Sequence, residues 1–588
     1  MIKNLIISDH AALWSKTNNI LIGEWCANNK GNFNIKKKNY KTTNYHWDNK
    51  KKIKEDLNYL YKLYDFILNS LTLKLNKYHN INFTKRCWEI VLSKWLWFYI
   101  LFYFDRWEQI NNLSNKKKLF AKLINFDADS FVSEDSQNFA KIIVSNDWNH
   151  WSYSEIIKFT KKIKYKYINK SKVKISISNN KKPNYLSFKI FVAKIFNTLS
   201  TKNFYCLNVF YGLLAQVNFS IVFREFRSRI IFYKQYKEYK LDVKIREKYL
   251  SIKKRKSTIF EKFILQNIIR NLPKSYFENF SSINEMISTL SLPESPKAIM
   301  TANEHHFNDV FKIYCASKVM NKSKYYIFQH GGSYGSADVF PTEKLDIKIS
   351  DKFFSWGWQE KDSKINKFFC NKNFFKKRII KRKKKTAGVV IPYIECLLYL
   401  NNIASGRPRN KNDVKKYVDT LKDFYGNLKP KIKKNSFFKS GYKIKPDPNM
   451  YGFYVKNSLK HYHKNAKFFA SDASTSRFLD KFKLSIETLN STGYLESLQL
   501  NLPTIIIFNK SFCGIRNTAK EDFNDLKKIN ILFDNPINAA NFINKNYNNL
   551  EEWWSNLELQ KIREKFCNKY VRNSDTPFQE FKNVLKNA

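Results

Sequence analysis

The chain has 588 residues and a formal net charge of +55, and 43% of its residues are hydrophobic and 16% aromatic. A chain of this length is too long to fold around a single hydrophobic core, and its apolar content excludes an intrinsically disordered protein. We therefore expect two globular domains with added segments. The lysines are spread almost evenly and accompany no nucleic-acid-binding motif, so we expect no nucleic-acid partner.

A membrane surface is a second interpretation of the positive charge. Each lysine near an anionic cytoplasmic leaflet contributes roughly 1 kcal/mol of attraction, so we expect a cytoplasmic protein that is peripheral at the inner membrane. The eight cysteines are scattered singly, as in a reduced cytosolic protein, and the N-terminus does not resemble a signal peptide. The most apolar stretch, residues 95–104, is too short to span a membrane and predicts a buried or interfacial helix.

Two short apolar runs near the N-terminus, residues 5–7 and 20–22, predict the first strands of an α/β domain. The second run ends in a glycine turn that contains Glu24 and Trp25, and His46 follows in a Tyr-His-Trp-Asp sequence. Aromatic rings beside polar groups suit stacking on a sugar, so we predict that these three residues bind substrate. Tryptophans near turns are also common in protein cores, and that alternative stays open.

The segment 83–113 predicts a long helix that is rich in tryptophan. A strand-like run then leads into Asp127 and Asp129, whose D-x-D spacing resembles the pair that holds a divalent ion in metal-dependent nucleotide-sugar enzymes. Such a short motif often occurs by chance. We therefore predict an enzyme without a metal or another cofactor, and we keep this pair as the alternative metal site. Helical patterns follow over residues 156–289.

A strand-helix-strand unit is predicted in the middle of the chain. Apolar runs at 298–301 and 325–328 enclose a segment, 307–315, whose apolar residues share one helical face. A right-handed crossover of this kind joins parallel strands, and it would place the next residues at the carboxyl edge of the sheet, where open α/β folds bind ligands. A further strand is expected within 350–358.

The residues at that edge are our catalytic candidates. His330 follows the strand, and an imidazole suits the removal of a proton from a sugar hydroxyl or a hydrogen bond to a phosphate. Gln329 would supply neutral hydrogen bonds, and Gly331 and Gly332 would let a substrate approach the backbone. We add Tyr334 as a substrate contact. The alternative is that the glycines only form a tight turn.

A second α/β domain is predicted after the cluster of basic residues at 376–385, which is the expected linker. Apolar runs that predict strands alternate with helical patterns, which indicates a parallel sheet. The predicted strands are at 388–392, 442–446, 467–470 and 484–489.

The stretch NSTGYLESLQLNLPT, which begins at residue 490, predicts a helix that starts with hydroxyl side chains and unpaired amides. The free amides and the helix dipole favour an anion such as a phosphate. A carboxylate one turn further on is placed to accept hydrogen bonds from ribose, although an ordinary capped helix is the alternative. The predicted nucleotide-donor site comprises Lys443, Lys445, Ser491, Thr492, Gly493 and Glu496.

The spacing of Glu496 and Pro503 is similar to the E-x6-P signature of GT-B glycosyltransferases, in which the glutamate holds the nucleotide ribose. The whole chain resembles a family of uncharacterised transferases from bacterial surface-polysaccharide gene clusters, on the motifs GEWC, YHWD, QHGGSYG, SWGW and STGYLESLQLNLPT. Asn501 departs from the usual glycine, and Ser93-Lys94 departs from the expected Gly-Pro. The resemblance implies a GT-B-like architecture and glycan assembly, without identifying the sugar.

We therefore predict an α/β, GT-B-like fold in which two Rossmann-like parallel-sheet domains face each other across a cleft, with added terminal helices. The predicted division is an acceptor-side domain with helical insertions at 1–375, a linker at 376–385, a donor-binding domain at 386–545 and bracing helices at 546–588.

The predicted function is the transfer of a sugar from a nucleotide-sugar donor to a surface-polysaccharide or lipid-linked glycan acceptor. Two alternatives stay open. One is a CDP-glycerol-type glycerophosphotransferase, which also pairs a glycine-flanked histidine with a phosphate-binding helix. The other is a non-enzymatic polybasic adaptor of membranes or nucleic acid.

Overall fold

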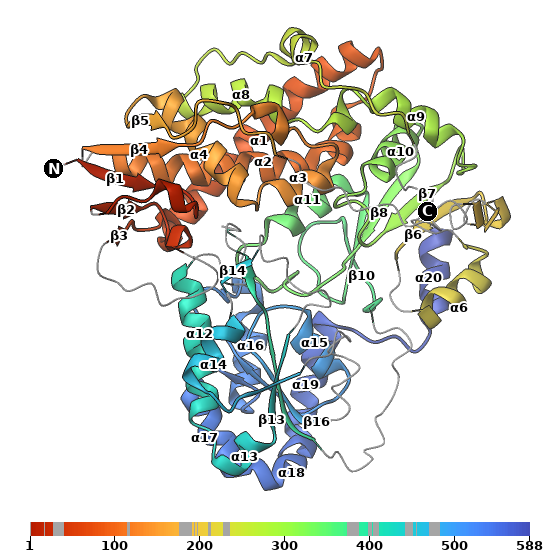
Figure 1. Ribbon diagram of the computed structural model, residues 1–588. Helices are drawn as coiled ribbons and strands as arrows, with labels where there is room; N and C mark the ends of the chain where they lie inside the picture. The colour runs from red at the N-terminus through yellow and green to blue at the C-terminus, as the bar shows by residue number, and fades with distance from the viewer. Residues whose placement is uncertain are drawn as a thin grey trace.

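Within the described residues, three parallel sheets of five, five and six strands organise the chain in the computed structural model (Figure 1). The structure describes residues 2–16, 18–27, 40–114, 118–175, 191–192, 195–196, 198–209, 213–226, 236–372, 387–397, 403, 408, 411–440, 451–453, 455–469 and 482–587. The predicted α/β class with Rossmann-like parallel sheets is confirmed.

The first sheet has the strand order β3-β2-β1-β4-β5, and all its pairings are parallel. Its strands are β1 (Lys3–Ile6), β2 (Asn19–Leu21), β3 (Tyr40–Thr42), β4 (Leu119–Leu123) and β5 (Lys164–Tyr167). The chain leaves the sheet after β3 for two long helices and returns at β4. The helices of this part are α1 (Lys50–His79), α2 (Lys85–Ser114), α3 (Ser136–Ile142) and α4 (Asn146–Thr160).

The second sheet has the order β10-β9-β8-β7-β6 and is also parallel. Its strands are β6 (Phe204–Leu207), β7 (Ala298–Thr301), β8 (Lys324–Phe328), β9 (Lys352–Ser355) and β10 (Ile365–Lys367). The predicted strand-helix-strand unit is confirmed as β7, α10 and β8. The helices are α6 (Leu213–Phe223), α7 (Val243–Leu250), α8 (Ile259–Asn271), α9 (Phe280–Ser288), α10 (Asp309–Met320) and α11 (Pro341–Ile349).

Helix α2 joins these two parts. It contacts α4 beside the first sheet and α10 beside the second, and its apolar residues are buried around the whole helix. The segment Lys85–Leu113 is long and apolar enough to cross a membrane, yet 94% of its most apolar window is buried inside the protein. The expectation of a buried helix at residues 95–104 is therefore confirmed.

The sequence predicted one Rossmann-like unit before residue 375, whereas the structure has two sheets there. Strands β5 and β6 were not predicted, because they lie within or beside a lysine-rich segment that has mainly helical patterns. Strand β5 alternates lysine with tyrosine, but it is only four residues long and exposed along its whole length, so this short pattern marks no buried face.

The third sheet has the order β15-β13-β11-β16-β17-β18 and is parallel. Its strands are β11 (Ala387–Tyr393), β13 (Ser436–Ser440), β15 (Lys467–Phe468), β16 (Phe482–Glu487), β17 (Thr504–Ile507) and β18 (Leu532–Phe533), and β12 (Cys396–Leu397) pairs with β14 (Tyr451–Phe453). Its helices are α12 (Lys411–Gly426), α13 (Pro430–Lys434), α14 (Val455–Tyr462), α15 (Thr492–Gln499), α16 (Lys520–Lys528) and α17 (Pro536–Asn546). The predicted linker at 376–385 and the strand at 442–446 lie outside the described residues.

The C-terminal helices connect the third sheet to the second. Helix α18 (Leu550–Ser555) packs on α19 (Leu557–Tyr570), and α19 packs beside α15 and α16. The backbone of Arg572 then donates to the Trp356 carbonyl at 2.8 Å. The last helix, α20 (Pro577–Lys586), packs on the second sheet, where the ring of Phe581 lies 6.1 Å from that of Phe328 (Figure 1).

Candidate functional site

The glycine turn after β8 lies directly against the start of α15. The backbone N–H of Gly332 donates to Thr492 Oγ1 at 3.0 Å, and the hydroxyl of Ser333 donates to the carbonyl of Asn490. A further backbone bond of 2.9 Å runs from Arg516 to Ser336. The carboxyl end of a strand in the second sheet therefore contacts the helix start that follows β16 in the third.

This contact requires glycine at position 332. A Cβ there would lie 2.4 Å from the carbonyl carbon and oxygen of Ser491 and 2.7 Å from the amide nitrogen of Thr492. These are backbone atoms, so no side chain can rotate to make room. At Gly331, by contrast, the nearest atom to an added Cβ is Thr492 Oγ1 at 3.4 Å, an ordinary contact.

Gly332→Ala is therefore expected to separate the two sheets locally, whereas Gly331→Ala should be tolerated. We expect Gly332→Ala to lower the free energy of unfolding by about 1–3 kcal/mol, the usual cost of overpacking, and to weaken donor binding. Urea unfolding and donor titration of both variants check this. Equal behaviour of the two variants would contradict the close approach at position 332.

The ring of His330 is held by hydrogen bonds at one nitrogen. Its Nδ1 lies 3.1 Å from the hydroxyl oxygen of Tyr334, and that hydroxyl donates its proton to Asp346 Oδ2 at 2.8 Å. The phenol oxygen can therefore only accept from His330, which places the proton of the neutral ring on Nδ1. No hydrogen bond from the described residues reaches Nε2, so this atom keeps a lone pair available to a substrate.

Asp346 organises the groups behind His330. Its Oδ1 is bonded to the Lys94 ammonium and lies 3.1 Å from His305 Nε2. Burial alone would raise the pKa of this carboxyl, but the charge of Lys94 and the bond from His305 hold the pKa well below its usual value. Asp346 is thus an ionised carboxylate in the interior, compensated by a buried cation.

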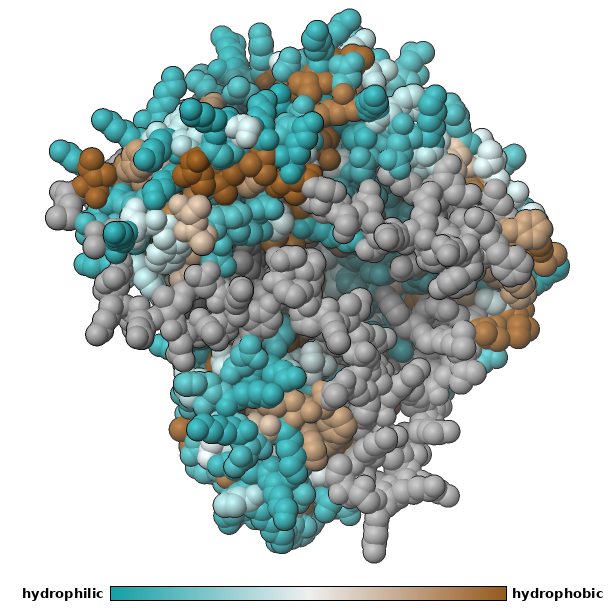
Figure 2. Space-filling view, viewed as in Figure 1, coloured by the Kyte–Doolittle hydropathy of each residue, from teal (hydrophilic) through white to brown (hydrophobic). Residues whose placement is uncertain are grey.

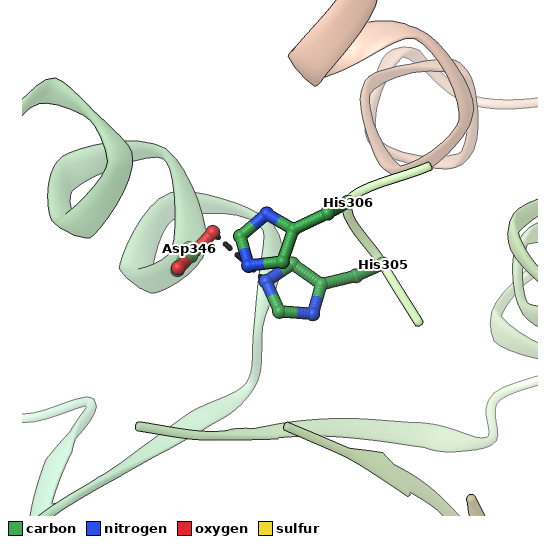
Figure 3. A group of neighbouring side chains, drawn as sticks. All are labelled: His305, His306 and Asp346. Atoms are coloured by element: carbon green, nitrogen blue, oxygen red, sulfur yellow. Dashed lines mark hydrogen bonds and ion pairs between the residues drawn. The ribbon is translucent and has the colours of Figure 1, made fainter. Parts of the chain in front are cut away.

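The side chains of His305, His306 and Asp346 form a group of metal-ligand type (Figure 3). One potential ligand atom from each lies within 4.8 Å of the others. However, the Asp346 oxygens are already bonded to Lys94, His305 and Tyr334, and a divalent cation would meet the Lys94 ammonium. We therefore interpret this group as a polar network that positions His330.

The ring of His330 is neutral in the folded protein. Burial lowers its pKa to about 3, and the charges of Lys94 and Lys372 act in the same direction, while Asp346 opposes them. Burial likewise lowers the pKa of the neighbouring His306, whose Nε2 lies 3.3 Å from His330 Nδ1. A neutral imidazole with a free Nε2 is a general base in its reactive protonation state.

Buried histidines should also make the protein less stable in mild acid. Burial lowers the pKa of His79 to about 4. It also lowers the pKa values of four other buried histidines, His150, His305, His306 and His330. Histidine titrates near 6.5 when unfolded, so the unfolded chain binds protons first as the pH falls, and stability declines below pH 6.5. Burial raises the pKa of Glu395 and Glu487 to about 7, which partly opposes the decline.

The free energy of unfolding in urea is therefore expected to be lower at pH 5 than at pH 7. His79 lies 3.0 Å from the Tyr276 carbonyl, and a glutamine amide can also donate there. His79→Gln should flatten the pH dependence by up to about 1.4 kcal/mol per pH unit, and the exposed His461→Gln should leave it unchanged. An unaltered dependence in His79→Gln would show that this ring is charged when folded.

On the opposite side of the contact, α15 begins as predicted. Ser491 is the N-cap, and its side chain makes no capping hydrogen bond. The hydroxyl of Thr492 accepts a hydrogen bond from the Gly332 N–H. The helix ends before Asn501, whose φ of 52° shows that asparagine takes the left-handed position of the usual glycine. The predicted cations Lys443 and Lys445 lie outside the described residues.

Lys372 is a candidate that sequence analysis missed. Its ammonium lies 3.4 Å from Glu496 Oε1, and its charge also lowers the pKa of His330, so it lies between the two predicted halves of the site. It adjoins a lysine-rich run, and no local pattern distinguishes it from its neighbours. Sequence analysis also missed Glu487. Its carboxylate lies at the start of α15, because a Cβ added to Gly493 would lie 2.6 Å from Glu487 Oε2.

Gln329 has a positioning role. Its Oε1 accepts hydrogen bonds from the Trp356 amide and the Trp358 indole at 2.9 and 2.8 Å, and its Nε2 donates to the Gly331 carbonyl at 2.8 Å. The side chain is 1% exposed. The prediction that it supplies hydrogen bonds to a ligand does not fit this geometry; Gln329 instead fixes the turn that carries His330.

The predicted substrate contacts near the N-terminus belong to the protein core. Trp25 is buried, and an added Cβ on Gly23 would lie 2.2 Å from its ring. His46 is buried and its Nε2 lies 3.0 Å from Asp105 Oδ1. A sugar cannot stack on rings that are already covered, so the core alternative fits both residues. The side chain of Glu24 lies outside the described residues.

The two aspartates of the D-x-D pair interact with nearby protein groups. Asp127 caps a short 3-10 helix (Ala128–Phe131) by accepting from the Asp129 backbone, and Asp129 Oδ1 lies 3.4 Å from Arg270 Nε. One oxygen of each carboxylate is thus engaged, and the pair stays the alternative metal site.

The model of a family described as "LIC12162 family transferase" matches residues 3–585. No curated protein matches the sequence. Among solved structures, the spinosyn rhamnosyltransferase SpnG complexed with spinosyn aglycone is 8% identical, with a TM-score of 0.27, and the match covers 52% of this chain and 77% of that one. An α,α-trehalose-phosphate synthase (UDP-forming) from Burkholderia vietnamiensis is 11% identical, with a TM-score of 0.29 and coverages of 53% and 80%. Scores this low carry no argument about fold or activity.

Proposed function

The chain belongs to the LIC12162 family of transferases, and from this we propose that it is a GT-B-like glycosyltransferase that uses a nucleotide-sugar donor. The observation that supports this most is the direct contact between the glycine turn that follows His330 in the chain and the start of α15. We infer that the base and the phosphate-suited helix start serve one group-transfer site, because the turn that carries the base contacts that helix start.

The proposed reaction begins with the acceptor hydroxyl near His330. Nε2 takes the hydroxyl proton as the acceptor oxygen bonds to the anomeric carbon, and the bond from that carbon to the donor phosphate breaks. The leaving phosphate takes both electrons of that bond and is stabilised by the α15 amides and by Lys372. Asp346, through Tyr334, stabilises the imidazolium that forms.

The donor class is tested by thermal denaturation with a panel of nucleotide sugars and CDP-glycerol. A donor at 100 times its Kd should raise the free energy of unfolding by about 2.7 kcal/mol. Product mass then separates the reactions, because a glycosyltransferase adds a glycosyl residue and a glycerophosphotransferase adds a phosphodiester. Stabilisation by CDP-glycerol alone, with a phosphodiester product, would overturn the proposal. We propose that the transfer needs no metal, so excess EDTA should leave the rate unchanged.

Glu496→Ala is expected to raise the donor KM more than it lowers kcat. We propose that its carboxylate, which Lys372 holds at 3.4 Å, accepts hydrogen bonds from the ribose, a contact that is equal in the ground and transition states. Initial rates against donor concentration check this, with the exposed Glu558→Ala as the control. A fall in kcat at an unchanged donor KM would contradict the ribose role.

We further propose that the acceptor is a surface-polysaccharide or lipid-linked glycan and that the protein works at the cytoplasmic face of the inner membrane. The motif resemblance and the net charge of +55 support this.

A further inference from the structure

A group of large apolar side chains is exposed at and before α6. Figure 2 shows apolar surface at the edge of the molecule where Figure 1 places α6. These side chains are between 44 and 63% exposed, which is unusual for residues of this size. They are Phe191, Ile195, Phe196, Leu199, Val217, Ile221 and Val222.

The opposite side of α6 is anchored in the protein. The rings of Phe219 and Phe223 lie 5.0 and 5.2 Å from that of Phe581 in α20, and Phe581 in turn packs near Phe328 of β8. Val217 and Ile221 are four residues apart and therefore share the outward face. This face is thus presented by a helix fixed to the second sheet, the sheet that carries His330.

A groove of about 690 Å³ lies beside this face, between residues 199–204, the end of α6 and α20. Phe204, Val222, Phe578 and Leu585 contribute its apolar walls, and two exposed cations, Arg224 and Lys582, line it as well. Exposed apolar residues beside cations match the boundary between acyl chains and phosphate headgroups of a lipid bilayer.

We propose that the outward face of α6, with this groove, docks on an anionic lipid bilayer. Ile221 and Val222 would enter the acyl boundary, and Arg224 and Lys582 would contact lipid phosphates. The two kinds of contact act together, because burial of the apolar side chains and attraction of the cations to lipid phosphates both favour the bound state. This surface does not depend on which group the enzyme transfers.

The test is flotation of the full-length protein with vesicles of phosphatidylglycerol and phosphatidylcholine, compared with phosphatidylcholine alone. The wild type should bind the anionic vesicles, and Ile221→Ser/Val222→Ser should need at least about tenfold more lipid for half-maximal binding. Ile259→Ser/Leu557→Ser is the matched control, because these residues are 60 and 79% exposed on other helices. It should bind like the wild type. Arg224→Gln/Lys582→Gln should weaken binding to anionic vesicles only.

Three outcomes would overturn the proposal: no binding by the wild type, equal binding by the two serine double variants, or a concentration-dependent dimer that only Ile221→Ser/Val222→Ser abolishes. The last result would assign the face to a second copy of the chain. Donor-induced thermal stabilisation, measured without lipid, should be the same in all variants, so a failure of this proposal is distinguishable from a failure of the proposed function.

Discussion

Replacing His330 with alanine is expected to lower kcat by about 100- to 10,000-fold, the usual contribution of general acid-base catalysis. In the proposed reaction, the variant loses the Nε2 lone pair that receives the acceptor proton. The proposal assigns the donor phosphate and ribose to the α15 side, so the donor KM should change little. Initial rates over a range of donor concentrations check both parts.

The hydroxyl of Tyr334 provides a graded control for this experiment. Tyr334→Phe keeps the ring but removes the acceptor for His330 Nδ1 and the link to Asp346. Its kcat should fall less than that of His330→Ala, because the base remains but its orientation is no longer fixed. Normal activity in His330→Ala would assign this residue to a purely structural turn. Donor-induced thermal stabilisation must persist in both variants for the comparison to hold.

Replacing Asp346 with alanine is expected to lower the free energy of unfolding by about 3–5 kcal/mol, the usual cost of leaving one partner of a buried ion pair without its counter-charge. Asp346 is fully buried, and Lys94 is 4% exposed. The substitution leaves the ammonium without its carboxylate and removes the acceptor of the Tyr334 hydroxyl as well. Urea unfolding at pH 7 measures the effect.

The double variant Lys94→Met/Asp346→Ala tests the cause. Because it removes the buried charge together with its partner, it should recover part of the lost stability. A surface pair supplies the matched control: Asp525→Ala, which breaks ion pairs with the exposed Lys528 and Lys565, should cost about 0–1 kcal/mol. If Asp346→Ala cost no more than Asp525→Ala, the ion pair would have no structural importance.

The sequence alone determined the local parts of the site. The apolar run before Gln329 predicted β8 and the turn at its carboxyl end, and NSTGYLES predicted the start of α15, since strand and helix patterns and capping residues act within a few neighbours. The parallel pairing of β7 with β8 followed from the helical crossover between them.

Only the tertiary structure decided what each side chain does. Lys94 and Asp346 are separated by 252 residues, and the Gly332–Thr492 contact spans 160. No local pattern encodes such pairs, because they depend on how α2, α11 and the third sheet pack against the second. The same packing buries Trp25 and His46. It also gives the Gln329 side-chain oxygen two hydrogen-bond donors and places the Lys372 ammonium beside the Glu496 carboxylate. Burial and hydrogen bonding between distant segments, which a linear pattern does not contain, separate residues that position the site from residues that can contact a substrate.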